Sequence, residues 1–104
     1  MKKYIIPFFV LLILTACHSE PPPDGVNTTY FFKGGPKKAE QTYKDGELNG
    51  LSTTYYKSGV VRSETNYKNG KIHGDMKRYA PNGALAGEAK FDNGVMVSQK
   101  KYLE

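Results

Sequence analysis

The sequence predicts an all-β fold, an elongated antiparallel meander built from stacked hairpins. Aromatic residues recur every twelve positions over most of the chain, and glycines recur every 24 positions. Between the glycines, polar and apolar side chains alternate, and β-branched and aromatic residues are common, which is typical of half-buried strands. A fixed period of this kind is the sequence signature of a repeat architecture.

The two periodic series define the repeat. The aromatic series holds Phe31, Tyr43, Tyr55, Tyr67, Tyr79 and Phe91, and its next place holds Leu103. The glycine series are Gly46, Gly70 and Gly94; Gly35, Gly59 and Gly83; and Gly50 with Gly74, where Ser98 takes the third place. We expect the five aromatic side chains from Tyr43 to Phe91 to pack together on one buried face. Tyr56, one residue out of phase, should point to the opposite face.

Turn residues divide the repeat region into strands. The dipeptides that accept positive φ in tight hairpin turns are Asp45-Gly46, Asn69-Gly70, Asn82-Gly83 and Asn93-Gly94, and Gly34-Gly35 and Ser58-Gly59 occupy equivalent places. Six or seven short strands are therefore expected, near residues 27–33, 37–44, 50–57, 60–68, 74–80, 84–91 and 95–103. Helices are not expected, because no stretch of this region is long without glycine or another turn residue.

The N-terminus has the zones of a secretory signal. Lys2 and Lys3 precede the uncharged apolar segment Tyr4–Leu14. As a helix this segment would reach roughly 17 Å, which is too short for a hydrocarbon core of about 30 Å. The following residues, Leu14-Thr15-Ala16-Cys17, resemble the lipobox of bacterial lipoproteins. The resemblance implies lipid transfer to the Cys17 thiol and cleavage after Ala16; the alternative is an ordinary signal peptide that a cysteine happens to follow.

The chain is thus expected to have three parts. Residues 1–16 form the cleaved signal, residues 17–25 a lipidated cysteine and a proline-rich tether, and residues 26–104 one repeat domain. Cys17 is the single cysteine, so no intramolecular disulfide can form. Without Lys2 and Lys3, 13 basic residues stand against 10 acidic ones, a mild excess spread along the chain. That excess permits contact with an anionic membrane surface and does not indicate a nucleic-acid partner.

The segment from Tyr67 to Gly74 (YKNGKIHG), followed by Tyr79 to Gly83 (YAPNG), resembles a MORN repeat, in the bacterial variant found in YwqK-family antitoxins. The similarity covers about residues 43–94. It implies hairpins stacked into a twisted sheet, roles in protein or lipid contact, and no common enzymatic activity. The chain departs from the pattern at Ser98, where the second glycine of the repeat is missing. Asn49 and Val97 take the place that His73 has in its own repeat. The last unit is therefore expected to be a cap.

The sequence contains no convincing catalytic, cofactor-binding or metal-binding residues. His18 lies in the tether, and His73 has only Asp75 as a close acid, so we interpret His73 as a hairpin residue. Glu40, Glu64 and Glu88 could line up on one face and bind a cation. Lys38 and Arg62, two residues before two of these glutamates, favour a charge-balanced solvent face instead. We therefore predict that the protein is not an enzyme and needs no cofactor.

The favoured function is a membrane-anchored, non-enzymatic module that binds a protein partner. Tyrosine offers a large contact area at low entropic cost, and the candidate contact residues are Tyr56, Arg62, Lys77 and Arg78. One narrower alternative is an immunity protein or antitoxin that neutralises a toxin. A rival alternative is a structural module that contacts membrane lipid or the cell wall. The anchor predicts a location in the cell envelope: the outer membrane facing the periplasm in a Gram-negative cell, or the outer face of the plasma membrane otherwise.

Overall fold

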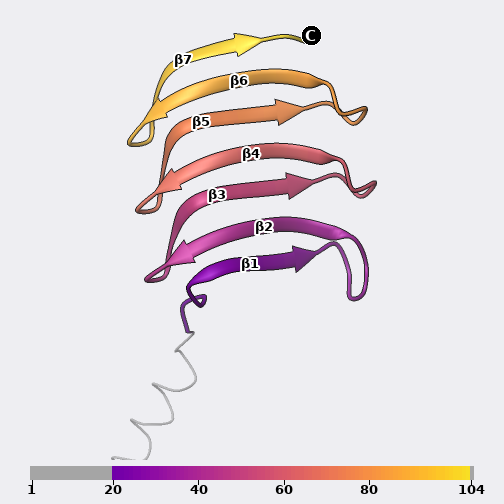
Figure 1. Ribbon diagram of the computed structural model, residues 1–104, viewed down its shortest axis with the longest axis vertical. Coiled ribbons are helices and arrows are strands. Elements are labelled where there is room, and N and C mark those ends of the chain that lie inside the picture. The colour runs from indigo at the N-terminus through magenta and orange to yellow at the C-terminus, as the bar shows by residue number, and fades with distance from the viewer. Residues whose placement is uncertain (1–19, 104) are drawn as a thin grey trace, which may run out of the picture.

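A computed structural model describes residues 20–103; the predicted signal segment and Cys17 lie outside this range. The described chain forms one open sheet of seven strands in sequence order, each antiparallel to the next (Figure 1). The strands are β1 (Gly25–Tyr30), β2 (Lys37–Lys44), β3 (Glu47–Tyr55), β4 (Val61–Lys68), β5 (Lys71–Tyr79), β6 (Leu85–Asp92) and β7 (Val95–Lys101). The predicted all-β meander is confirmed. No helix among the described residues is long and apolar enough to cross a membrane.

Two strands begin earlier than predicted because two glycines lie inside them. β3 starts at Glu47 and β5 at Lys71, whereas the sequence placed their starts at Gly50 and Gly74. Both glycines have positive φ, 113° and 99°, which only glycine adopts easily. At the first of them Gln41 pairs with Ser52 but Tyr43 pairs with Leu48, so extra residues of β3 bulge out of the ladder. The glycines therefore form β-bulges inside strands.

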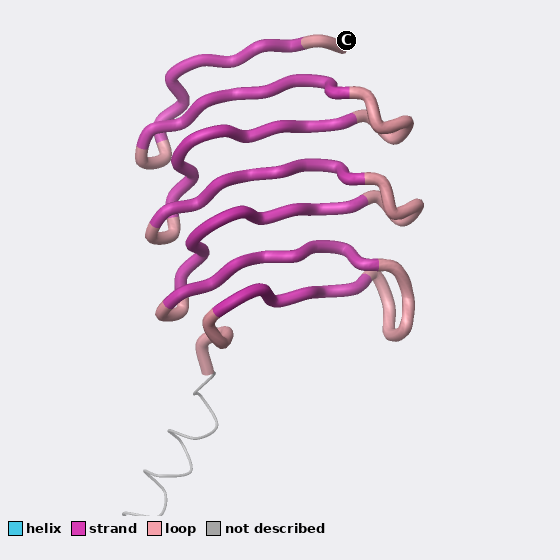
Figure 2. The backbone as a smooth tube through the Cα atoms, viewed as in Figure 1, coloured by secondary structure: helices cyan, strands magenta, loops and turns pink. Residues whose placement is uncertain are grey.

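The sheet has a different kind of turn along each of its two sides (Figure 2). On one side, Asp45, Asn69 and Asn93 have φ near 50° and are each followed by a glycine with positive φ. These are the predicted two-residue hairpins. On the other side the turns are wider: Ala80 N donates to Ala84 O, and among the two turn residues Asn82 and Gly83 only the glycine has positive φ. The prediction that Asn82 and Gly83 form a tight two-residue turn is wrong, because Asn82 does not adopt positive φ. Its side chain instead accepts a hydrogen bond from Ala84 N.

The register divides the strand residues between two faces. Gln41, Ser52, Thr65, Met76, Ala89 and Gln99 pair in one continuous row. We call the face that carries this row the groove face. Its centre holds the core, in which Ala39, Ser52 and Thr65 are 9%, 6% and 7% exposed. Small side chains fill this centre, so the core is thin and stability depends on contacts between neighbouring strands.

The opposite face carries the row Glu40, Thr53, Glu64, Lys77, Glu88 and Lys100, each paired with the next. We call this face the ladder face. Successive residues of a strand point to opposite faces, so the two rows alternate along every strand.

The aromatic series is split between the two faces. Tyr43, Tyr67 and Phe91 belong to the groove face, where they pair directly with Leu48, Ile72 and Met96. Tyr55 and Tyr79 belong to the ladder face, where their hydroxyls donate to glutamates. The prediction that all five rings share one buried face is wrong. The bulges add residues between successive aromatic positions, so equal spacing in sequence does not mean one face.

The end of the predicted tether lies against the first tight turn. Asp24 Oδ1 accepts a hydrogen bond from Asp45 N at 2.8 Å, and Asn27 Nδ2 donates to Pro23 O at 3.0 Å. Pro21 lies close enough to Gly46 that a Cβ there would be 3.3 Å from the Pro21 Cβ. The segment from Pro21 to Asp24 is therefore attached to the sheet.

Candidate binding surfaces

The ladder face brings the three predicted glutamates together. Glu40, Glu64 and Glu88 occupy one row, with Thr53 and Lys77 between them. Acidic and basic side chains directly opposite each other attract, so the alternation of Glu64, Lys77 and Glu88 stabilises the sheet. The predicted alignment of carboxylates on one face is confirmed.

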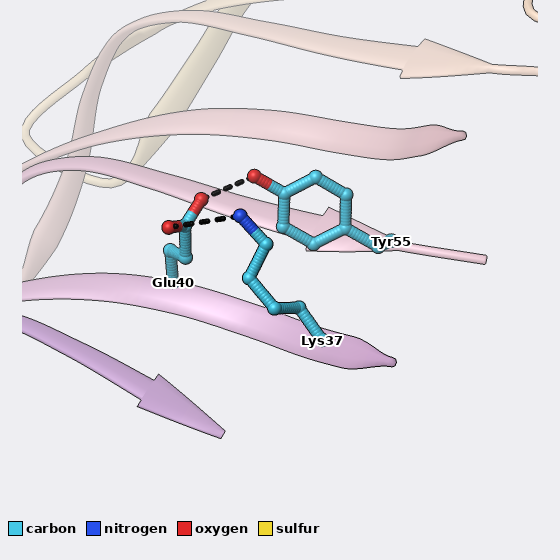
Figure 3. A network of polar contacts seen from close by, with 3 residues as sticks. All are labelled: Lys37, Glu40 and Tyr55. Atoms are coloured by element: carbon cyan, nitrogen blue, oxygen red, sulfur yellow. Dashed lines mark hydrogen bonds and ion pairs between the residues drawn. The ribbon is translucent and has the colours of Figure 1, made fainter. Parts of the chain in front are cut away.

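Each of these glutamates accepts a hydrogen bond from a tyrosine hydroxyl. Tyr79 donates to Glu64 Oε1 at 2.8 Å and Tyr102 to Glu88 Oε1 at 3.2 Å. Tyr55 donates to Glu40 in the same way (Figure 3). The hydrogen bond to Glu64 raises the pKa of Tyr79, because the neighbouring carboxylate favours the protonated phenol.

Lys37 completes the first of these contacts. Its Nζ lies 3.3 Å from Glu40 Oε2 and 5.1 Å from the centre of the Tyr55 ring (Figure 3). The Tyr55 hydroxyl and the Lys37 ammonium together hold the pKa of Glu40 below its ordinary value. Lys38 was predicted to balance this charge, but the register shifts between Thr29 and Tyr30, so that Tyr30 pairs with Lys37 and Lys38 is left unpaired in the bulge. Arg62 occupies the same unpaired place in β4.

The aromatic series continues at Tyr102 and not at Leu103. β7 has one residue fewer in its bulge than β3 and β5: Lys90 pairs with Ser98 while Phe91 pairs with Met96. Ser98 therefore lies within the paired ladder and does not replace the bulge glycine. The Tyr102–Glu88 contact was missed in the sequence because the deletion breaks the period by one residue.

The groove face contains the main hollow of the sheet. One part, of about 510 Å³, is lined by seven residues: Thr54, Tyr56, Arg62, Ser63, Met76, Arg78 and Tyr79. A second part, of about 490 Å³, extends over β6 and β7 and includes Gly87, Ala89, Met96 and Lys101. Met76 and Arg78 line both parts, so the two hollows adjoin across the strands of the groove face, and we call them together the groove.

Three of the four predicted contact residues lie at this groove. Tyr56, Arg62 and Arg78 line it, and the Tyr56 hydroxyl donates to Tyr79 O at 2.7 Å. The prediction that Tyr56 points away from the aromatic series is wrong for Tyr67, which belongs to the same groove face. Lys77 lies on the ladder face, where it lines a smaller hollow of about 330 Å³ with Asp75 and Glu88. The four residues therefore do not form one surface.

The groove face is basic and holds an unpaired hydroxyl. None of the strand positions that the register assigns to this face holds aspartate or glutamate. Glu88 also borders the groove, but its carboxylate bonds to Tyr102 on the ladder face. Ser52 Oγ is buried at the centre of this face and has no hydrogen-bond partner among the described residues. Sequence reasoning missed Ser52, because nothing in its neighbours indicated that its hydroxyl would be unpaired.

His73 holds a turn in place. Its Nδ1 accepts a hydrogen bond from Asn93 N at 3.1 Å and lies 3.6 Å from Asp92 Oδ1. Its neighbouring acid is thus Asp92 of the next hairpin. Within residues 20–103, no group of three or more His, Cys, Asp and Glu side chains is arranged to hold a metal ion.

The comparisons with known proteins agree with this repeating geometry. A family model described as a MORN repeat variant matches residues 48–69 and again residues 72–93. These two segments are therefore similar to MORN-type repeats. No curated protein and no solved structure matches the chain.

Each matched MORN repeat spans one hairpin with a wide turn, β3 with β4 and β5 with β6. The tight turns join successive repeats, and each bonds back to the previous one: Gly70 N donates to Leu48 O and Gly94 N to Ile72 O, both at 2.8 Å. β1, β2 and β7 lie outside the matched residues. They extend the same sheet beyond the two matched MORN repeats.

Proposed function

We propose that this protein is a membrane-anchored, non-enzymatic module of the cell envelope that binds a protein partner in the groove. The observation that carries the proposal is the groove itself, lined by Arg62, Arg78 and Lys101; the acidic residue that borders it, Glu88, bonds to Tyr102. The ladder face differs, because its glutamates are already bonded to tyrosines and lie beside lysines.

The charge and shape of the groove favour an acidic, extended segment of a partner. Arginine binds carboxylates through two parallel hydrogen bonds, and Met76 and Met96 offer adaptable apolar contacts. Arg78 on β5 and Lys101 on β7 are two strand spacings apart, about 9.5 Å. A polyproline II segment advances about 3.1 Å per residue and turns once every three residues, so acidic groups three residues apart would lie on one side and match the two cations.

Charge reversal on adjacent residues tests the groove. Arg78→Glu changes the groove face, and Lys77→Glu changes the ladder face of the same strand. The lipidated wild-type protein and both variants would be used to capture partners from native envelope, followed by mass spectrometry. We expect Arg78→Glu to reduce capture of the principal partner by about tenfold or more, and Lys77→Glu to retain it. Circular dichroism would first confirm that both variants fold, because Lys77→Glu places a third carboxylate between Glu64 and Glu88. With both folded, equal loss of capture, or loss only in Lys77→Glu, would reject the groove as the binding site.

The anchor has its own test. Only a thiol accepts the lipid at a lipobox, so we expect Cys17→Ser to remain unprocessed or to be exported without lipid. Detergent-phase partitioning and the mass of the mature protein measure this. A serine variant that partitions into detergent at the mature mass would disprove the anchor.

A narrower form of the proposal makes the partner a toxin, in keeping with the resemblance to YwqK-family antitoxins. An immunity protein should bind its toxin tightly and be encoded beside it. The measurement is growth protection: cells expressing a neighbouring toxin should survive with the wild-type protein and die with Arg78→Glu. The absence of any toxin gene nearby would count against this form while leaving the groove proposal intact.

A further inference from the structure

The free edge of the sheet at β1 carries exposed apolar side chains among polar ones and is almost uncharged. Val26, Tyr30 and Phe32 are 65%, 53% and 61% exposed. β1 contains no charged residue, and the turn that follows it, residues 31–36, contains only Lys33. Exposed aromatic side chains beside a lysine are typical of segments that lie at a membrane–water interface.

The turn between β1 and β2 is shaped to present Phe32. It is longer than the later wide turns: Phe31 N donates to Pro36 O, whereas Tyr56 N donates to Val60 O. Gly35 leaves room for the Phe32 ring, since a Cβ at that position would be 2.5 Å from the ring. The turn reaches below β1 in the view of Figure 1, away from the rest of the sheet, at the end of β1 opposite to the one where the N-terminal segment joins it.

The N-terminal segment keeps this edge close to any anchor on Cys17. Asp24 is bonded to the first tight turn, and Pro21 lies beside Gly46. Only residues 18–20 separate Cys17 from Pro21. A fully extended chain spans at most about 3.6 Å per residue, so the distance from Cys17 to Pro21 is at most about 14 Å.

We infer that the β1 edge of the sheet rests on the lipid bilayer, with Tyr30 and Phe32 at the level of the headgroups and Lys33 beside lipid phosphates. This inference rests on the proposed lipid anchor. In this orientation β1 contacts the membrane, and β7, at the opposite edge of the sheet, lies farthest from the membrane. The groove runs across the strands, so it extends away from the membrane and is open to a partner from the aqueous side.

A single tryptophan reports this contact, because the chain contains no tryptophan of its own. The full-length lipidated protein would carry either Phe32→Trp or, as the matched control, Pro81→Trp. The control places the same fluorophore in the exposed wide turn between β5 and β6. Both variants would be incorporated into vesicles of phosphatidylglycerol and phosphatidylcholine with brominated acyl chains, and circular dichroism would confirm that both fold.

We expect Phe32→Trp to lose most of its emission in brominated vesicles and to shift to the blue, while Pro81→Trp keeps its emission. If both variants stay in the vesicle fraction and neither is quenched, the β1-edge contact is wrong but the anchor stands. If neither variant cofractionates with vesicles, the anchor itself fails and the inference fails with it. A blue shift of Phe32→Trp without quenching, together with a dimer mass, would show that a second copy covers the β1 edge and would also overturn the inference.

Discussion

The two faces of the sheet use the same tyrosine-rich repeat for different purposes. On the groove face, Tyr43, Tyr67 and Phe91 pair with aliphatic side chains, and the phenylalanine shows that a hydroxyl is not needed there. On the ladder face, the tyrosine hydroxyls bond to glutamates. One face is therefore held by ring packing and the other by polar contacts.

This difference separates stability from binding. The ladder face satisfies its own charges, so a partner would have to break existing contacts to use its carboxylates. The groove face leaves Arg62, Arg78 and Lys101 without an acidic neighbour on that face, and its floor has small side chains. A partner can add contacts there without removing any.

The largest expected effect tests ring packing on the groove face. Tyr67→Ala should lower the free energy of unfolding by about 2 kcal/mol, less than for a fully buried aromatic because Tyr67 is half-buried. Tyr67→Phe should change it by less than about 0.5 kcal/mol, since Phe91 occupies the equivalent place. Denaturant melts measure both. A large loss in Tyr67→Phe would mean that the hydroxyl, and not the ring, matters on this face.

The bulge glycines decide which residues share a face, so changing one should disturb both faces. Gly74 has a φ of 99°, and valine there should cost roughly 1–2 kcal/mol of backbone strain. Asp75→Val, next to it on the ladder face, is the control and should cost less, because Asp75 makes only an exposed ion pair with Lys90. Equal midpoints in denaturant would contradict the bulge at Gly74.

A smaller effect is expected from removing a ladder hydroxyl. Tyr79→Phe loses the bond to Glu64 and should cost about 1 kcal/mol or less, given the partial exposure of the pair. The comparison with Tyr67→Phe is direct, because the same oxygen is removed from opposite faces. If both substitutions were neutral, the tyrosine–glutamate contacts would not contribute to stability.

The first ladder contact should also depend on pH. The pKa of Glu40 is lowered in the folded protein by Tyr55 and Lys37, so its contribution is complete above the unfolded value of about 4.3. This contribution to stability is lost as the pH falls through the lowered pKa that Glu40 has in the folded protein. We therefore expect Tyr55→Phe to be less stable than the wild type at pH 7, with a difference that shrinks as the pH falls through the lowered pKa of Glu40. A stability difference that does not change with pH would show that the Glu40 carboxylate is not involved.

The sequence was sufficient for the fold because the repeat is nearly exact. The Asn-Gly and Asp-Gly turns fix hairpins, and hairpins in series can only form an antiparallel meander. The face of each side chain was not predictable in the same way. It depends on how many residues each bulge contains, and Gly50 and Gly74 were interpreted as strand starts when they lie within strands. Tyr102 shows the same effect, since one missing residue in β7 shifts the aromatic position from 103 to 102.

The candidate surface was partly predictable for the same reason. Tyr56, Arg62 and Arg78 lie at one groove, but Lys77 is next to Arg78 in sequence and therefore on the other face. A glycine inside an otherwise regular strand pattern is a recognised signal for a bulge. Applied to Gly50 and Gly74, that signal would have corrected the register.

The smallest expected effect concerns the unpaired hydroxyl of Ser52, at the centre of the groove face. A buried hydroxyl without a hydrogen bond keeps its desolvation cost, so Ser52→Ala should leave stability unchanged or raise it by up to about 1 kcal/mol. Ser63→Ala is the matched control, because Ser63 Oγ lies 2.6 Å from Thr54 Oγ1 and this bond would be lost. The two serines lie on neighbouring strands of the same face, and only Ser63→Ala should lower the unfolding midpoint. If Ser52→Ala destabilised the protein as much as Ser63→Ala, the Ser52 hydroxyl would have a partner, such as a water molecule, and the centre of the groove face would be more polar than its protein contacts indicate.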